Sequence, residues 1–102
     1  MLVVRDVFQA KYGRGDELVA LFQELDGHWR AAMRRLPFRS FRILTDASGT
    51  FFTVVTEMEV DNMAAWEGVV AQELALPQFA DWFARMAPLV ETGRREFYHL
   101  VR

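Results

Sequence analysis

The fold of this chain is constrained most strongly by the order in which segments with strand-like and helix-like patterns of apolar residues follow one another. Segments 2–9, 38–46, 50–60 and 95–101 are rich in β-branched and aromatic residues, which is typical of strands. In the two longer stretches between them, apolar residues recur every three or four positions, as they do in amphipathic helices. The sequence therefore predicts the order strand, helix, strand, strand, helix, strand.

Residues with known capping preferences mark where the helices begin. Asp16 can accept hydrogen bonds from first-turn amides, and the apolar period after it continues to Leu36. Asp61 or Asn62 can cap the second helical region in the same way. Pro77 suits the first turn of a further helical segment, because its missing amide hydrogen is not needed there.

Glycines mark the expected turns and ends. Gly49 lies in Ala47-Ser48-Gly49, between the two central strands, and glycine readily adopts the positive φ that tight turns require. We therefore expect a β-hairpin over 38–60. We also expect the last helical segment to stop near Gly93, because glycine is favoured just after a helix.

This element order is that of the ferredoxin-like β-α-β-β-α-β pattern. Right-handed crossovers place both helical layers on the same face of one four-stranded antiparallel sheet. We therefore expect an α+β fold, with residues 1–102 forming a single domain. Nothing in the predicted elements covers the other face of the sheet.

The strands carry apolar residues on both of their faces. In the first strand, Leu2 and Val4 alternate with Val3, and Phe8 with Val7. In the hairpin we assign to the helix-covered face Phe41, Ile43, Phe52, Val54 and Met58. The uncovered face then collects a mixed set of apolar and polar residues: Phe38, Ser40, Arg42, Leu44, Phe51, Thr53, Val55, Glu57 and Glu59.

A face of this kind favours a covering partner, because burying one large apolar side chain contributes roughly 1.5 to 3 kcal/mol. We therefore expect a homodimer in which two uncovered faces meet and enclose a small cavity, giving a dimeric α/β barrel. The alternative is that the C-terminal segment or the loops of the same chain fold over this face.

Composition excludes several functional classes. The formal net charge of −2 offers no general attraction to nucleic acids or anionic membranes, so we expect neither as a partner. With no cysteine, the chain has no disulfide, thiolate zinc site or cysteine nucleophile. Because Arg5 and Asp6 interrupt the first apolar segment, we expect no signal peptide and a cytoplasmic location.

A small set of polar side chains is a candidate for chemistry. We expect His99, in the last strand, to face the cavity and act as a general base near neutral pH. Arg42 and Glu57 lie on the same expected face and are candidate ligand-binding groups. The alternative is that these two form a cross-strand ion pair. His28 and His99 lack the spacing of metal ligands, so we expect no metal and no cofactor.

Two aromatic residues are further candidates for binding a ligand. Tyr12 lies in the loop before the first helix, and Trp66 lies on the second helical region, so both can line the mouth of a cavity. The alternative for Trp66 is a place in the core, since tryptophans at helical spacing usually pack there.

The element order, the two-faced strands and the ending Gly93-Arg94-Arg95-Glu96-Phe97-Tyr98 resemble the dimeric α/β-barrel superfamily. The nearest branches are the NIPSNAP-like and the antibiotic-biosynthesis-monooxygenase-like proteins. This resemblance implies a homodimer, and it covers nearly the whole chain. Known members include cofactor-independent monooxygenases, haem-degrading enzymes, lactone isomerases and ligand-sensing domains, so the fold does not select a function.

Single residues of this sequence help to choose among the activities that the resemblance implies. The haem-degrading branch has an axial histidine on its second helical region, and residues 62–90 contain none. Asn62 and Trp66 are similar to an asparagine and a tryptophan near the cavity of the monooxygenase branch. We expect a protein that binds a small apolar or aromatic molecule between two sheets. The alternatives are a cofactor-independent monooxygenase or isomerase, and a structural or regulatory assembly module.

Overall fold

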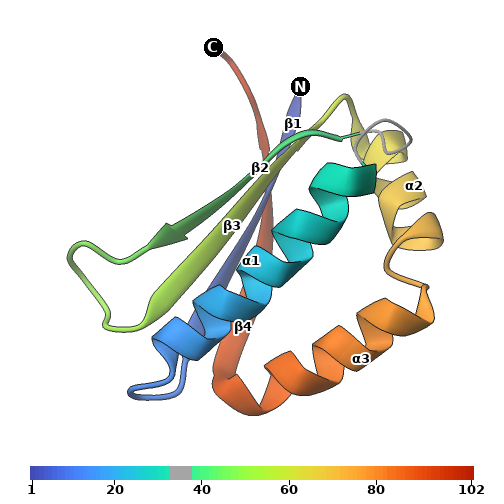
Figure 1. Cartoon of the computed structure of the whole chain (residues 1–102). Helices are drawn as coiled ribbons and strands as arrows, with labels where there is room; N and C mark the ends of the chain where they lie inside the picture. Colours follow the sequence, from blue (N-terminus) through green and yellow to red (C-terminus); the bar gives the residue numbers. More distant parts are fainter. Residues whose placement is uncertain (33–37) are drawn as a thin grey trace.

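The computed structural model describes residues 1–32 and 38–102 and confirms the predicted order of elements (Figure 1). The elements are β1 Leu2–Ala10, α1 Gly15–Ala32, β2 Phe38–Thr45, β3 Thr53–Val60, α2 Met63–Gln72, α3 Pro77–Met86, the 3-10 turn η1 Ala87–Leu89 and β4 Val90–His99. The part of the first helix expected over 33–36 lies outside the described residues.

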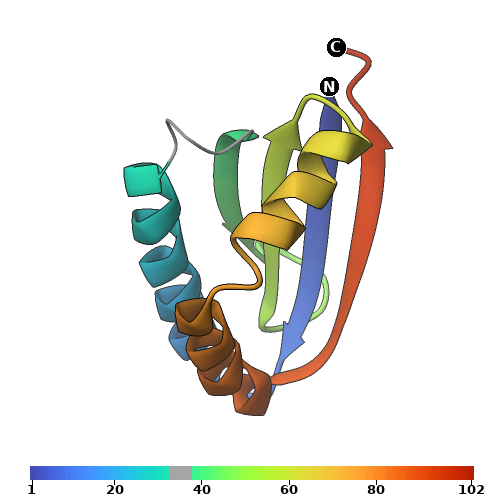
Figure 2. The ribbon, with the colours of Figure 1, turned by 90° about the vertical axis from the view of Figure 1, so that its right-hand side faces the viewer.

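The four strands form one antiparallel sheet in the order β2-β3-β1-β4. All three helices lie on one side of it, and its other side, which we call the open face, carries none of the described helices (Figure 1, Figure 2). The two ends of the chain meet at one end of the sheet, where the Leu100 amide donates to the Met1 carbonyl over 3.0 Å. This confirms the ferredoxin-like α+β fold. No described helix is long and apolar enough to span a bilayer.

Helix α1 packs on β2 and β3 because one stripe of its side chains is apolar. Leu18, Phe22, Leu25 and Trp29 recur at helical spacing and are all buried. The Trp29 ring meets the Phe41 ring edge-to-face, with centroids 4.9 Å apart. This aromatic contact fixes the distance between α1 and the edge strand β2.

The start of α2 confirms the capping prediction, and its C-terminus lies before Pro77 as expected. The Asn62 side-chain oxygen accepts a hydrogen bond of 2.9 Å from the Ala65 amide, so Asn62 is the N-cap. Helix α2 ends at Gln72, and α3 then begins with Pro77 in its first turn. The break between them turns the chain, so that α3 runs back toward β4 (Figure 2).

The predicted end of the last helix near Gly93 is wrong. Helix α3 ends at Met86, and β4 already begins at Val90, five residues before the predicted strand. The Leu89 carbonyl accepts a 2.8 Å hydrogen bond from the Lys11 amide, which draws this segment toward the end of β1. Gly93 is therefore a strand residue, and it lies directly opposite Phe8.

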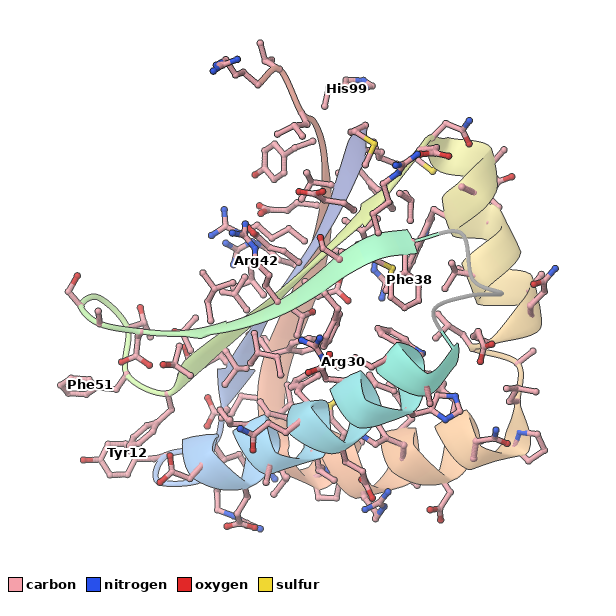
Figure 3. All side chains as sticks on the ribbon, turned by 45° about the horizontal axis from the view of Figure 1, so that its top comes forward. Tyr12, Arg30, Phe38, Arg42, Phe51 and His99 are labelled. Atoms are coloured by element: carbon pink, nitrogen blue, oxygen red, sulfur yellow. The ribbon has the colours of Figure 1, made fainter. Side chains whose placement is uncertain are left out.

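The assignment of Phe38 to the open face is also wrong. Phe38 is buried beneath the helices, with its ring centroid 5.5 Å from that of Trp29 (Figure 3). The register of β2 against β3 shifts between Phe38 and Ser40, and such an irregularity moves a side chain to the other face. From Phe41 onward the predicted alternation holds, with Phe41, Val54 and Met58 buried under the helices.

The contact between Gly93 and Phe8 generates a stability prediction. A Cβ at Gly93 would lie 2.8 Å from Cδ1 of the Phe8 ring, which already packs against Phe22. Gly93→Ala should lower the free energy of unfolding in urea by about 1 to 3 kcal/mol. Gly27→Ala is the control, because nothing lies within 4 Å of a Cβ there and α1 should gain about 1 kcal/mol. Equal stability of the two variants would contradict this packing.

Candidate functional site

An apolar cavity of about 140 Å³ lies between the helix-covered face of the sheet and the three helices. No pattern in the sequence predicts a hollow on this side. Most of its lining is aromatic or aliphatic, and three polar side chains complete it. The apolar lining residues are Val4, Phe8, Phe22, Leu25, Trp29, Phe41, Met58, Trp66, Leu74, Phe79, Trp82, Phe83 and Met86.

All three tryptophans of the chain line this cavity. Trp82 is held firmly, because its indole N–H donates a 2.8 Å hydrogen bond to the Leu21 carbonyl of α1. The Trp82 ring also stacks on Phe79, with centroids 5.5 Å apart and planes 22° apart. Because large rings that are anchored in this way cannot move into the space between them, a gap remains in the packing. Such a gap is suited to a flat apolar guest.

The polar part of the lining is a row of three residues on adjacent strands, which we call the polar ledge: Thr56 on β3, Asp6 on β1 and Arg95 on β4. The Asp6 carboxylate accepts two hydrogen bonds from the Arg95 guanidinium, at 2.7 Å and 3.0 Å. The same guanidinium lies 4.8 Å from the centroid of the Trp66 ring. The ion pair with Asp6 and the cation–π contact with Trp66 together fix the position of Arg95.

The polar ledge can bind an oxygen atom of a guest molecule. A guanidinium has five N–H donors, and only two of those on Arg95 are used by Asp6. Thr56 is buried, and its hydroxyl can either donate or accept. An aromatic molecule bearing a hydroxyl or carbonyl would therefore find apolar walls and a polar contact in one place.

The predicted site residues do not gather in one place. Trp66 lines the cavity. Arg42 and Glu57 lie on the open face and form an ion pair across β2 and β3, and Arg42 points away from the helices (Figure 3). Glu57 also lies 3.6 Å from Nε of Arg5 on β1. Tyr12 is 83% exposed and meets the Phe52 ring edge-to-face, away from the cavity.

The expected orientation of His99 is wrong. His99 lies opposite Leu2, so it shares the helix-covered face rather than the open face of Arg42 and Glu57. It is exposed at the end of β4 and makes no side-chain hydrogen bond within residues 1–32 and 38–102 (Figure 3). No partner that would orient it as a general base is present in that part of the chain.

A metal centre has no support in the described ranges. No group of three or more histidine, aspartate or glutamate side chains lies close enough there to hold an ion. His28 lies 3.5 Å from the carboxylate of Glu73, beside a separate hollow of about 210 Å³ between α1 and α3.

The polar ledge was missed by the sequence analysis, although part of it left a signal. Asp6 falls on the same alternation phase as Leu2, Val4 and Phe8, so a charged residue stood at a core position of the first strand. Its partner Arg95 could be found only from the register of β1 against β4. No sequence pattern specifies that register.

The open face carries a second row of charges across all four strands. From β2 to β4 the charges of the side chains in this row alternate in sign, in the order Arg42, Glu57, Arg5 and Glu96. Hydrogen bonds from the Arg94 guanidinium and from Tyr98 lower the pKa of Glu96. Because its pKa is depressed in the folded chain, Glu96 contributes to stability at neutral pH, and this contribution is lost as the pH falls through that value.

The ion pair of the polar ledge should be energetically coupled. We expect the double-mutant cycle of Asp6→Ala and Arg95→Ala to give a coupling of about 1.5 to 3 kcal/mol in urea unfolding, because the Asp6 side chain is only 17% exposed. The exposed pair Arg94 and Glu96 on the same strand is the control, with a coupling below about 1 kcal/mol. Equal couplings would show that the ledge is no more sheltered than the surface.

Comparison with known proteins gives a likeness in structure alone. No protein-family model matches the sequence, and no curated protein matches it. An uncharacterized NIPSNAP domain protein from Burkholderia xenovorans is 22% identical, with a TM-score of 0.80 over 99% of this chain and 95% of that chain. A putative antibiotic biosynthesis monooxygenase from Deinococcus radiodurans is 18% identical, with a TM-score of 0.71 over 100% of this chain and 94% of that chain.

A third solved structure is that of SnoaB, a cofactor-independent oxygenase from Streptomyces nogalater. It is 15% identical, with a TM-score of 0.73 over 99% of this chain and 93% of that chain. At such identities the likeness shows a shared fold. The predicted resemblance to the NIPSNAP-like and antibiotic-biosynthesis-monooxygenase-like proteins is thus confirmed at the level of the fold.

Proposed function

We propose that this protein binds a small aromatic or apolar molecule in the cavity between its sheet and its helices. The observation that carries the proposal is an apolar cavity of about 140 Å³ with one polar ledge at its wall. An apolar cavity of about 150 Å³ is large enough to bind benzene. The proposed site therefore lies on the face opposite to the one expected from the sequence.

The energetics of the cavity support this proposal. An empty apolar cavity costs about 24 cal/mol per Å³ relative to a filled one, because its lining lacks contacts on one side. A guest that restores those contacts recovers part of this free energy. The bidentate contact between Asp6 and Arg95 holds the ledge in place before any guest arrives, so little ordering remains to be done.

A second candidate function is cofactor-independent oxygenation of a hydroxylated aromatic molecule. The polar ledge favours it, because the Arg95 guanidinium can stabilise the oxygen anion of a deprotonated phenol. SnoaB, which shares the fold, is described as such an oxygenase. Consumption of dissolved oxygen on addition of a bound phenol or hydroquinone separates this activity from binding alone.

We further propose that two chains pair through their open faces. Leu44 and Tyr98 are 39% and 48% exposed there, beside Val7 and Val55 in the centre of the sheet. The alternating row of charges around Glu57 has no net charge, so it can face a second copy of itself without repulsion. A hollow of about 760 Å³ on this face would become an enclosed space in such a pair.

Ligand binding predicts a measurable and site-specific affinity. Phenol should bind to the purified protein in calorimetry and change its tryptophan fluorescence, because all three indoles line the cavity. Leu74→Trp replaces an aliphatic side chain of the lining with a bulky aromatic ring, which should fill the cavity and abolish binding. Ala75→Trp, at the exposed neighbouring position, is the control and should retain binding. Binding that survives Leu74→Trp would place the ligand elsewhere.

Pairing through the open face predicts a dimer in sedimentation at micromolar concentration, at twice the chain mass of 11.9 kDa. Val7→Lys places a charge in the centre of the open face and should yield monomers that keep the native circular dichroism. Val70→Lys introduces the same charge on the exposed surface of α2 and should leave the dimer intact. A wild-type chain that sediments as a monomer would refute the pairing.

A further inference from the structure

The apolar cavity adjoins an open groove between α3 and the edge strand β4. This groove has a volume of about 380 Å³. Five residues line both the cavity and the groove: Asp6, Phe8, Phe83, Met86 and Arg95. The two spaces are therefore neighbours that share one boundary, and a molecule in the cavity can extend toward the groove across it.

The boundary toward the groove is weaker than the opposite wall. On the side of α1, Trp82 is hydrogen-bonded to the Leu21 carbonyl and packs against both Phe22 and Phe79. On the groove side, Phe83 is 51% exposed, and its one ring contact within the described residues is to Phe79 at 6.5 Å. A side chain that is half in solvent can change rotamer at lower cost than one held on both faces.

Gly93 of β4 and Phe8 of β1 lie at the floor of the groove. Gly93 lies directly opposite Phe8, and the Phe8 ring covers it. The Phe8 ring therefore forms the surface of the floor at this point, and no side chain of Gly93 enters the groove. The cavity itself is close in volume to one that holds a single benzene ring, so a second fused ring would have to lie across the boundary at Phe83.

The charges around the groove favour an uncharged occupant. The Arg95 guanidinium is paired with Asp6, and Arg94 is paired with Glu96 at 3.2 Å. Glu91 also lines the groove, is exposed, and forms no ion pair in the described part of the chain. A carboxylate or phosphate in the groove would therefore meet an uncompensated negative charge rather than a free cation.

We propose that the ligand class of this protein is a single aromatic ring that carries one extended, uncharged substituent. The ring occupies the cavity against the polar ledge, and the substituent passes Phe83 into the groove between α3 and β4. This inference rests on the proposed binding function and narrows it. It excludes fused polycyclic molecules as the preferred ligands.

The experiment compares three phenols by calorimetry on the wild-type protein: phenol, 4-n-butylphenol and 2-naphthol. Each methylene group buried in the groove should tighten binding about fourfold. With two of them buried, 4-n-butylphenol should bind at least about tenfold more tightly than phenol. It should also bind more tightly than 2-naphthol, whose rigid second ring cannot bend past Phe83 into the groove as a flexible chain can.

A matched pair of variants locates the substituent. Ala87→Phe fills the groove from η1 without altering the cavity lining, and should remove the gain from the butyl chain while leaving the affinity for phenol unchanged. Ala84→Phe places the same ring on the exposed surface of α3, outside the groove, and should change neither affinity. Circular dichroism and the melting temperature verify that both variants fold.

The outcomes separate this inference from the function on which it rests. If phenol fails to bind, the proposed function is refuted, and the ligand class with it. If phenol binds but the butyl chain gives no gain, or if Ala87→Phe keeps that gain, only the use of the groove is refuted. If 2-naphthol binds as tightly as 4-n-butylphenol, the restriction to a single ring is refuted.

Discussion

Three helices on one face of a four-stranded sheet impose the constraint on which the rest of this molecule depends. The strands carry apolar residues on both faces, so the helices can cover only one of the two apolar faces of the sheet. On the sheltered side, bulky rings such as Trp29, Phe41 and Trp82 hold the layers apart, which leaves a cavity. On the other side, apolar residues mixed with paired charges remain uncovered.

The Asp6–Arg95 ion pair is the exception within the sheltered layer. Placing a carboxylate among core residues is costly unless it is paired and hydrogen-bonded. Here the register of β1 against β4 puts a guanidinium directly opposite, and Trp66 stacks over it. The Arg95 side chain remains 42% exposed, so the fold tolerates this pair at the edge of the sheet. The guanidinium N–H donors that do not bond to Asp6 are the part of the pair that would serve the proposed ligand.

The sequence predicted the elements and their order because strand and helix periods are local properties. It failed where the answer depended on pairing between distant segments. The bulge at Phe38 reversed the face of one residue, and Gly93 proved to be a strand position opposite Phe8 rather than a helix end. For the site, Trp66 was expected at a cavity between two sheets, whereas it lines a cavity between the sheet and the helices of one chain. The partners Asp6 and Arg95, which are 89 residues apart, meet only through the register.

Strand β4 connects the two faces of the molecule. Its alternate side chains serve different purposes: Arg95 points to the cavity, while Arg94 and Glu96 belong to the open face. As an edge strand, β4 is paired on one side only, so β1 and the side chains on its two faces determine how firmly it is held. In the proposed dimer, a second chain on the open face would hold β4 in place from behind. The polar ledge, which depends on the position of Arg95, would then be better ordered in the pair than in a single chain.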